Sequence, residues 1–116
     1  MKNPNIISTS LIPIGGRRKV NPLRVIALVA DVNYTLAHLD DGQVIIVATP
    51  LKTLAARFQS ATFFRTHKSF MINMSYVVSY DEEHHLFVDM PNNLRANIAR
   101  RKRTAFRISF QNFKLK

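Results

Sequence analysis

The stretch FFRTHKSFMIN, residues 63–73, joins two apolar ends through a polar, cationic centre. Phe63-Phe64 at one end and residues 70–72 at the other are typical of buried β-strands. A segment anchored at both ends presents its central donors to solvent, where they suit phosphate groups or the edges of nucleic-acid bases. These candidate donors are Arg65, His67, Lys68 and Ser69.

Short strand-like segments separated by turn residues make up most of the remaining chain. Residues 24–30 are mainly small and β-branched, which predicts a buried strand. Residues 40–42, Asp-Asp-Gly, predict a hairpin turn because Gly42 adopts a positive φ at no steric cost, and residues 91–93 predict another. Many short strands favour an all-β domain of small packed sheets. We expect a single domain over residues 10–116, preceded by a flexible arm at residues 1–9.

Two helices complete the expected fold. Thr49 suits an N-cap and Pro50 the first helical position, so a short internal helix should begin there. The apolar spacing of residues 105–113 predicts a short C-terminal helix within a basic segment. Residues 76–80 are expected to form a strand. Asn33 is expected to supply the left-handed backbone of an early turn.

Charge is distributed unevenly along the chain. There are 17 Lys and Arg against 7 Asp and Glu, which gives a formal net charge of +10. All the acids lie between Asp31 and Asp89, whereas the segment after Ala99 is basic and residues 17–19 form a second basic group. This asymmetry indicates a polyanionic partner, because neutralising phosphates releases counterions. Basic tails that only aid solubility are the alternative.

Other classes of protein receive little support. The chain has no cysteine, which excludes disulfides and thiolate metal sites. The longest apolar run, residues 25–30, is too short to span a bilayer, and the N-terminus lacks a signal-peptide core, so we expect a cytoplasmic protein. His84-His85 is a weak metal candidate, since adjacent side chains usually point apart. No catalytic triad or glycine-rich phosphate loop is recognisable, so no enzymatic activity, metal or cofactor is expected.

The central stretch resembles the signature of the LytTR family, bacterial DNA-binding domains built almost wholly of β-structure. Further landmarks stand in the family's order over about residues 11–103. They are a strand ending in Asp31 with Asn33-Tyr34 after it, the Asp41-Gly42 turn, the helix start at residues 49–52, and Arg100-Arg101. The family usually has Ser before this Arg pair, where this chain has Ala99.

The resemblance implies both a fold and a mode of binding. The fold would be mainly β, an elongated stack of small antiparallel sheets with one short internal helix and a short C-terminal helix. The protein would be a stand-alone transcription regulator that binds double-stranded DNA sequence-specifically, with loops in successive major grooves. Paired direct repeats in the DNA, a homodimer on that DNA and a regulatory protein partner are further expectations.

Individual residues can be given expected roles. Arg100 and Arg101 are candidates for base readout, because guanidinium groups bind guanine O6 and N7 bidentately. Lys68 would reach a base or a phosphate, and Asn33 would pair with adenine unless it only forms its turn. The other candidates would position the backbone or add sequence-independent attraction: Arg65, His67, Ser69, Arg17, Arg18, Lys102 and Arg103.

Structural roles and a second function stay open at this point. Arg65 is a candidate ion-pair partner of Asp31 or Asp89, and Asn73 is expected to bond the backbone. Four aromatic residues are expected in the core rather than on a base-stacking surface: Tyr34, Phe63, Phe64 and Phe70. Three others are expected to dock the C-terminal helix, with an exposed stripe that serves a partner as the alternative: Phe106, Phe110 and Phe113. The alternative function is an interaction module whose basic face binds RNA or an acidic protein.

Overall fold

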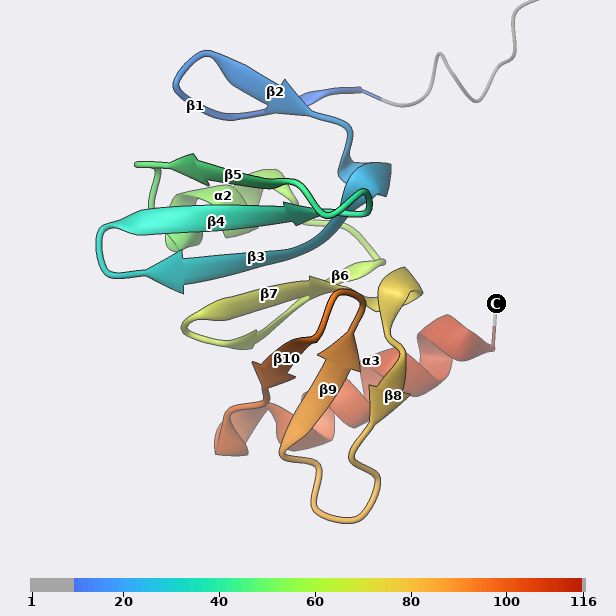
Figure 1. The fold of residues 1–116 in the computed structure, drawn as a ribbon. Coiled ribbons are helices and arrows are strands. Elements are labelled where there is room, and N and C mark those ends of the chain that lie inside the picture. Colours follow the sequence, from blue (N-terminus) through green and yellow to red (C-terminus); the bar gives the residue numbers. More distant parts are fainter. Residues whose placement is uncertain (1–9, 116) are drawn as a thin grey trace, which may run out of the picture.

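The computed structural model describes residues 10–115, which form three antiparallel sheets and two α-helices (Figure 1). The first sheet pairs β1 (Ile12–Gly15) with β2 (Arg18–Val20). The central sheet has the strand order β5-β4-β3-β7-β6 and consists of β3 (Val25–Asp31), β4 (Tyr34–Leu39), β5 (Val44–Val47), β6 (Phe63–His67) and β7 (Phe70–Asn73). The third has the order β10-β9-β8 and consists of β8 (Ser79–Tyr80), β9 (Phe87–Met90) and β10 (Leu94–Asn97).

The helical elements connect and cover these sheets. They are α2 (Leu51–Arg57), α3 (Arg103–Lys114) and the short 3-10 turns η1 (Pro22–Arg24), η2 (Met74–Tyr76) and η3 (Arg100–Lys102). The described chain extends over 44 × 37 × 24 Å. The expected mainly β stack of small antiparallel sheets with a short internal and a short C-terminal helix is therefore confirmed.

A separate apolar core fills each side of the central sheet. The β1–β2 hairpin and α2 close the first core, in which Leu54 and Phe58 are buried. The third sheet and α3 close the second core, in which Ile72 and Phe106 are buried. Burial of each such side chain stabilises the fold by about 1.5–3 kcal/mol, so the middle strands of the sheet are held from both sides.

Tight turns reverse the chain between neighbouring strands. Gly42 has φ 91° in the β4–β5 turn, and Asn92 and Asn93 have φ 63° and 61° in the β9–β10 turn, as expected from their sequences. In the β3–β4 turn the expectation was wrong. The left-handed residue is Val32, with φ 55°, rather than Asn33. The reason is the register of the two strands. Because Asp31 pairs with Tyr34, only two residues form the loop, and the favoured two-residue hairpin turns need a positive φ at the first of them.

The start of α2 differs from the prediction by one residue. Pro50 is the N-cap, with extended φ and ψ of −63° and 149°, and the helix begins at Leu51. The Pro50 carbonyl accepts from the N–H groups of Thr53 and Leu54. Thr49 instead lies in the bend between β5 and the helix, where its carbonyl accepts a 2.6 Å hydrogen bond from the Thr35 hydroxyl.

Asn73 organises the connection between β7 and β8. Its Nδ2 donates to the Val25 carbonyl at 3.0 Å, and its Oδ1 accepts from the N–H of Ser75 at 3.0 Å, which caps η2. The predicted structural role of this buried amide is confirmed. The strand expected over residues 76–80 was too long, because η2 occupies its beginning and only Ser79–Tyr80 pairs with β9.

The aromatic residues of α3 fill the second core. Phe106 is completely buried, with ring centroids 5.3 Å from Phe64, 5.4 Å from Tyr80 and 5.5 Å from Phe110. The prediction that this segment docks as a helix is confirmed. Phe63 is buried too, whereas the assignment of Tyr34 to the core was wrong, since its side chain is 53% exposed.

Candidate nucleic-acid interface

Four polar or cationic segments lie along one edge of the molecule, on the left in Figure 1. They are the β1–β2 turn at residues 16–17, the β3–β4 turn at residues 32–33, the β6–β7 turn at residues 68–69, and η3, which leads from β10 into α3. We call these four segments the basic edge. Asn33, Lys68 and Arg101 all belong to it, and all three are exposed.

Contacts near Thr49 fix the first two segments relative to each other. Gly15, which precedes the β1–β2 turn, lies so close to Thr49 that an added Cβ atom would meet the Thr49 hydroxyl. On the other side, the hydroxyl of buried Thr35 in β4 donates to the Thr49 carbonyl. Residues 16–17 and 32–33 therefore flank one packed junction rather than moving as separate loops.

Main-chain hydrogen bonds fix the other two segments. The Ala30 N–H in β3 donates to the Ser69 carbonyl at 2.9 Å, which holds the β6–β7 turn beside the end of β3. The Ala99 N–H donates to the Thr66 carbonyl at 2.7 Å, which holds η3 beside β6. The backbone of these two segments of the basic edge is thus hydrogen-bonded directly to strands of the central sheet.

The β6–β7 turn is shaped by its own side chains. Arg65 Nε donates to the His67 carbonyl at 3.1 Å and its Nη2 donates to the Lys68 carbonyl at 2.7 Å. His67 Nδ1 accepts from the Ser69 N–H at 3.0 Å, so the neutral ring carries its proton on Nε2. Burial lowers the pKa of Arg65. The suggested ion pair of Arg65 with an acid is wrong, because both bonds described above go to the turn that this residue supports.

Two arginines of η3 face solvent, whereas the next two basic residues lie closer to the domain. Arg100 and Arg101 are exposed and form no ion pair with the described residues. Lys102 is half-buried, with Nζ 5.8 Å from the centre of the Phe64 ring. Arg103 is half-buried, and its Nε has no hydrogen-bond partner within residues 10–115. On the β1–β2 hairpin, Arg17 and Arg18 are both exposed.

Ala99 occupies the N-cap position of η3 and supplies no side-chain hydrogen bond there. An Ala99→Ser variant is expected to gain about 0.5–2 kcal/mol in free energy of unfolding, because a serine hydroxyl accepts from a free N–H at this position. Urea unfolding measures the gain. Ala105→Ser, an exposed α3 position, is the control and should be neutral or slightly destabilising. Equal effects of the two changes would contradict a capping role.

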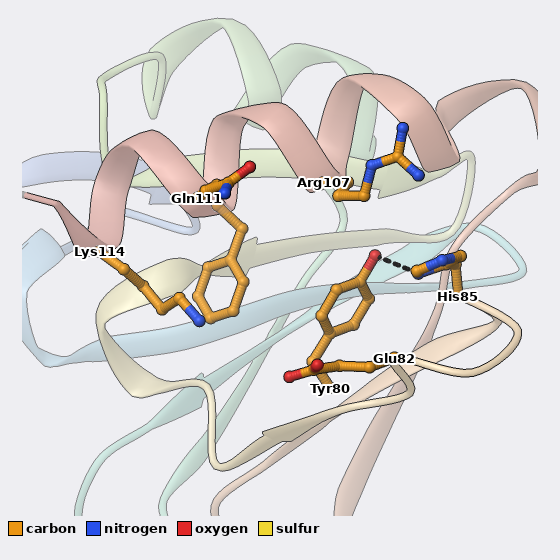
Figure 2. A pocket seen from close by; sticks show the side chains of 7 residues that line it. Tyr80, Glu82, His85, Arg107, Gln111 and Lys114 are labelled. Atoms are coloured by element: carbon orange, nitrogen blue, oxygen red, sulfur yellow. Dashed lines mark hydrogen bonds between the residues drawn. The ribbon is translucent and has the colours of Figure 1, made fainter.

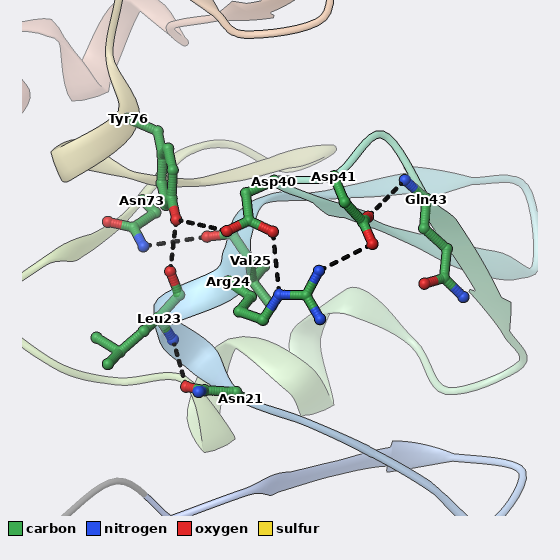
Figure 3. A network of polar contacts seen from close by, with 9 residues as sticks. All are labelled: Asn21, Leu23, Arg24, Val25, Asp40, Asp41, Gln43, Asn73 and Tyr76. Carbon is green, nitrogen blue, oxygen red and sulfur yellow. Dashed lines mark hydrogen bonds and ion pairs between the residues drawn. The ribbon is translucent and has the colours of Figure 1, made fainter. Parts of the chain in front are cut away.

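Acidic residues of the β4–β5 turn lie at the other end of β4 and are paired there (Figure 3). Arg24 Nε lies 3.0 Å from Asp40 Oδ1, and its Nη2 lies 2.8 Å from Asp41 Oδ2. The N–H of Gln43, and then Arg24, lower the pKa of the Asp41 carboxyl by hydrogen bonding. Arg24 therefore compensates part of the negative charge of this turn, at a distance from the basic edge.

A hollow of about 220 Å³ opens between α3 and the β8–β9 loop (Figure 2). Tyr80 and His85 bond each other there, with 2.8 Å between the hydroxyl and Nδ1, and Arg107 and Lys114 line it from α3. Glu82 also lines the hollow, so a carboxylate lies among these basic side chains. Within residues 10–115, no group of three or more His, Cys, Asp or Glu side chains is placed to hold a metal ion.

The fold is a domain built mainly of β-strands, and its basic edge suits an anionic polymer. A model of the LytTr DNA-binding domain family matches residues 15–111, and the chain belongs to this family. It is therefore a DNA-binding domain of a family of transcription regulators, which is not an enzyme family. No helix within the described residues is long and apolar enough to cross a membrane.

A solved structure supports the same assignment at the level of the fold. It is a LytTr DNA-binding domain from Bacillus cereus, taken from a protein described as a methyl-accepting/DNA response regulator. The two chains share 18% sequence identity and superpose with a TM-score of 0.70, over 88% of this chain and 95% of that one. A comparison with curated protein sequences found no match.

Proposed function

We propose that this domain binds double-stranded DNA sequence-specifically and regulates transcription, with the turns of the basic edge inserted into successive major grooves. One observation carries the proposal: three segments are fixed along one edge. Residues 32–33 are enclosed by the paired ends of β3 and β4, and main-chain hydrogen bonds hold residues 68–69 beside β3 and η3 beside β6. Segments whose backbone is fixed in this way lose little backbone freedom on binding, so more of the interaction energy contributes to affinity.

The size of the domain suits this mode of binding. Successive major grooves on one face of B-DNA are roughly 34 Å apart. The largest dimension of the domain is 44 Å, so a single copy is long enough to reach two of them. A net charge of +10 adds long-range attraction to the phosphates.

The proposed contacts follow the exposure of each side chain. Arg101 and Arg100 read bases, because both are exposed on η3, where a bidentate contact to guanine is possible. Lys68 and Asn33 contact bases or phosphates from their turns.

Other residues have supporting roles. His67 and Ser69 position the phosphate backbone, and Arg65 acts by holding their turn in shape. The remaining bases supply sequence-independent attraction: Arg17, Arg18, Lys102 and Arg103.

Two further levels of organisation belong to the proposal. Paired direct repeats in the DNA would place two protomers in the same orientation, so any contact between them would join different surfaces of the two copies. A regulatory protein partner would then control whether the basic edge is free to bind DNA.

Selection from a random duplex pool, followed by competition gel shifts, tests the proposal. We expect one duplex to be enriched and its complex to survive an excess of random duplex and of RNA. Equal loss to random duplex would contradict sequence-specific readout. Preferential loss to RNA would favour the alternative, an RNA-binding module.

A further inference from the structure

Val32 combines three properties that are unfavourable in an isolated domain. It is β-branched, its φ is 55°, and its side chain is 90% exposed. This is the highest exposure among the large apolar side chains in the described part of the chain. Val32 is also the first residue of the two-residue turn that joins β3 to β4, at the basic edge.

Local chemistry favours other residues at this position. The β3–β4 pairing closes at Asp31 and Tyr34, and only the first of the two residues between them has a positive φ. Glycine is the usual residue at that place in such a turn, because a β-branched side chain clashes with its own backbone there. Backbone outliers of this kind persist where the surrounding structure enforces them, and they are concentrated at functional sites.

The neighbourhood of Val32 indicates what its side chain meets. Ala30, two residues earlier, is bonded to the turn that carries Lys68, so Val32 lies beside other segments of the basic edge. Among the groups exposed in a major groove, the C5 methyl of thymine is the apolar one. We propose that the Val32 isopropyl group contacts a thymine methyl group and thereby selects thymine at one position of the DNA site, an inference that rests on the proposed function.

Replacing thymine by uracil removes only this methyl group and gives a direct test. Each thymine of the selected duplex is changed to uracil in turn, and affinity is measured for the unmodified protein and for Val32→Gly. For the unmodified protein we expect affinity to fall about fourfold at one position, because that is the contribution of one buried methyl group to binding. Val32→Gly should bind the thymine duplex more weakly and show no loss at that position.

Stability separates this role from a structural one. Val32→Gly should raise the melting temperature, because glycine adopts the left-handed angle without strain, while affinity falls. Val44→Ala is the matched control, an exposed valine at the other end of the β4–β5 hairpin, and it should leave the uracil scan unchanged.

The possible failures can be told apart. If no duplex is enriched, the proposed function fails and this inference fails with it. If a duplex is enriched but lacks thymine, or if both proteins respond alike to every uracil, only the role of Val32 is overturned.

Discussion

A Phe106→Ala variant is expected to lose about 3–5 kcal/mol of its free energy of unfolding. Phe106 is 0% exposed and contacts aromatic rings from α3, β6 and β8. Truncation removes these contacts and leaves a cavity that the surrounding strands cannot fill, because Phe64 and Tyr80 are anchored in paired strands. The helix α3, which directly follows η3, would then lose the side chain that packs most deeply into the second core.

Equilibrium unfolding in urea measures the loss. Ile108→Ala is the control on the same helix, since Ile108 is 52% exposed, and it should cost less than about 0.5 kcal/mol. Phe106→Leu, which retains part of the buried volume, should fall between the two and keeps the experiment informative if the alanine variant does not fold. Similar losses for Phe106→Ala and Ile108→Ala would contradict the second core as described.

Arg101→Ala is expected to weaken binding of the selected duplex by about 1–3 kcal/mol, which is roughly five- to 150-fold in affinity. The guanidinium is exposed on η3, and the backbone beneath it is bonded to β6 through Ala99 and Thr66. Loss of a bidentate contact should relax the base preference at one position of the site. Affinity for random duplex should fall much less.

Two matched arginine variants define the alternatives to base readout. Arg18→Ala, on the β1–β2 hairpin, should weaken all duplexes alike and reduce the slope of log K against log salt by about 0.9. Arg107→Ala, on α3 beside the hollow, should change neither specificity nor the salt slope. If Arg101→Ala behaved like Arg18→Ala on both selected and random duplex, Arg101 would be a phosphate contact and the assignment of readout would be wrong.

The elements that could be predicted from the sequence depend on local chemistry. Gly42 and the pair Asn92-Asn93 mark their turns because few other residues adopt positive φ readily. The pairing of β3 with β7 joins residues far apart in the chain, such as Ala27 and Ile72, and hydrophobic periodicity carries no signal for it. The order of strands in the central sheet follows only from the family resemblance or from the structure.

The candidate site was predictable as a set of segments, but less so as a set of side chains. The tolerance of Asn for left-handed angles pointed to Asn33, whereas strand register assigns that angle to Val32. As a cationic residue, Arg65 was a natural candidate for contact with DNA, yet its guanidinium donates hydrogen bonds to the carbonyl groups of His67 and Lys68. An apolar β-branched residue between an acid and Asn, in a turn two residues long, was the available signal for Val32.

We propose that one rigid edge, made of four separate chain segments, forms the DNA-binding surface. Backbone amide chemical shifts recorded during titration with the selected duplex test it most directly. We predict large changes at residues 16–17, 32–33, 68–69 and 100–102. We predict small changes at residues 40–43, at the opposite end of β4. Changes centred on residues 40–43 or on the hollow lined by Arg107 and Lys114, with the four segments unaffected, would contradict it.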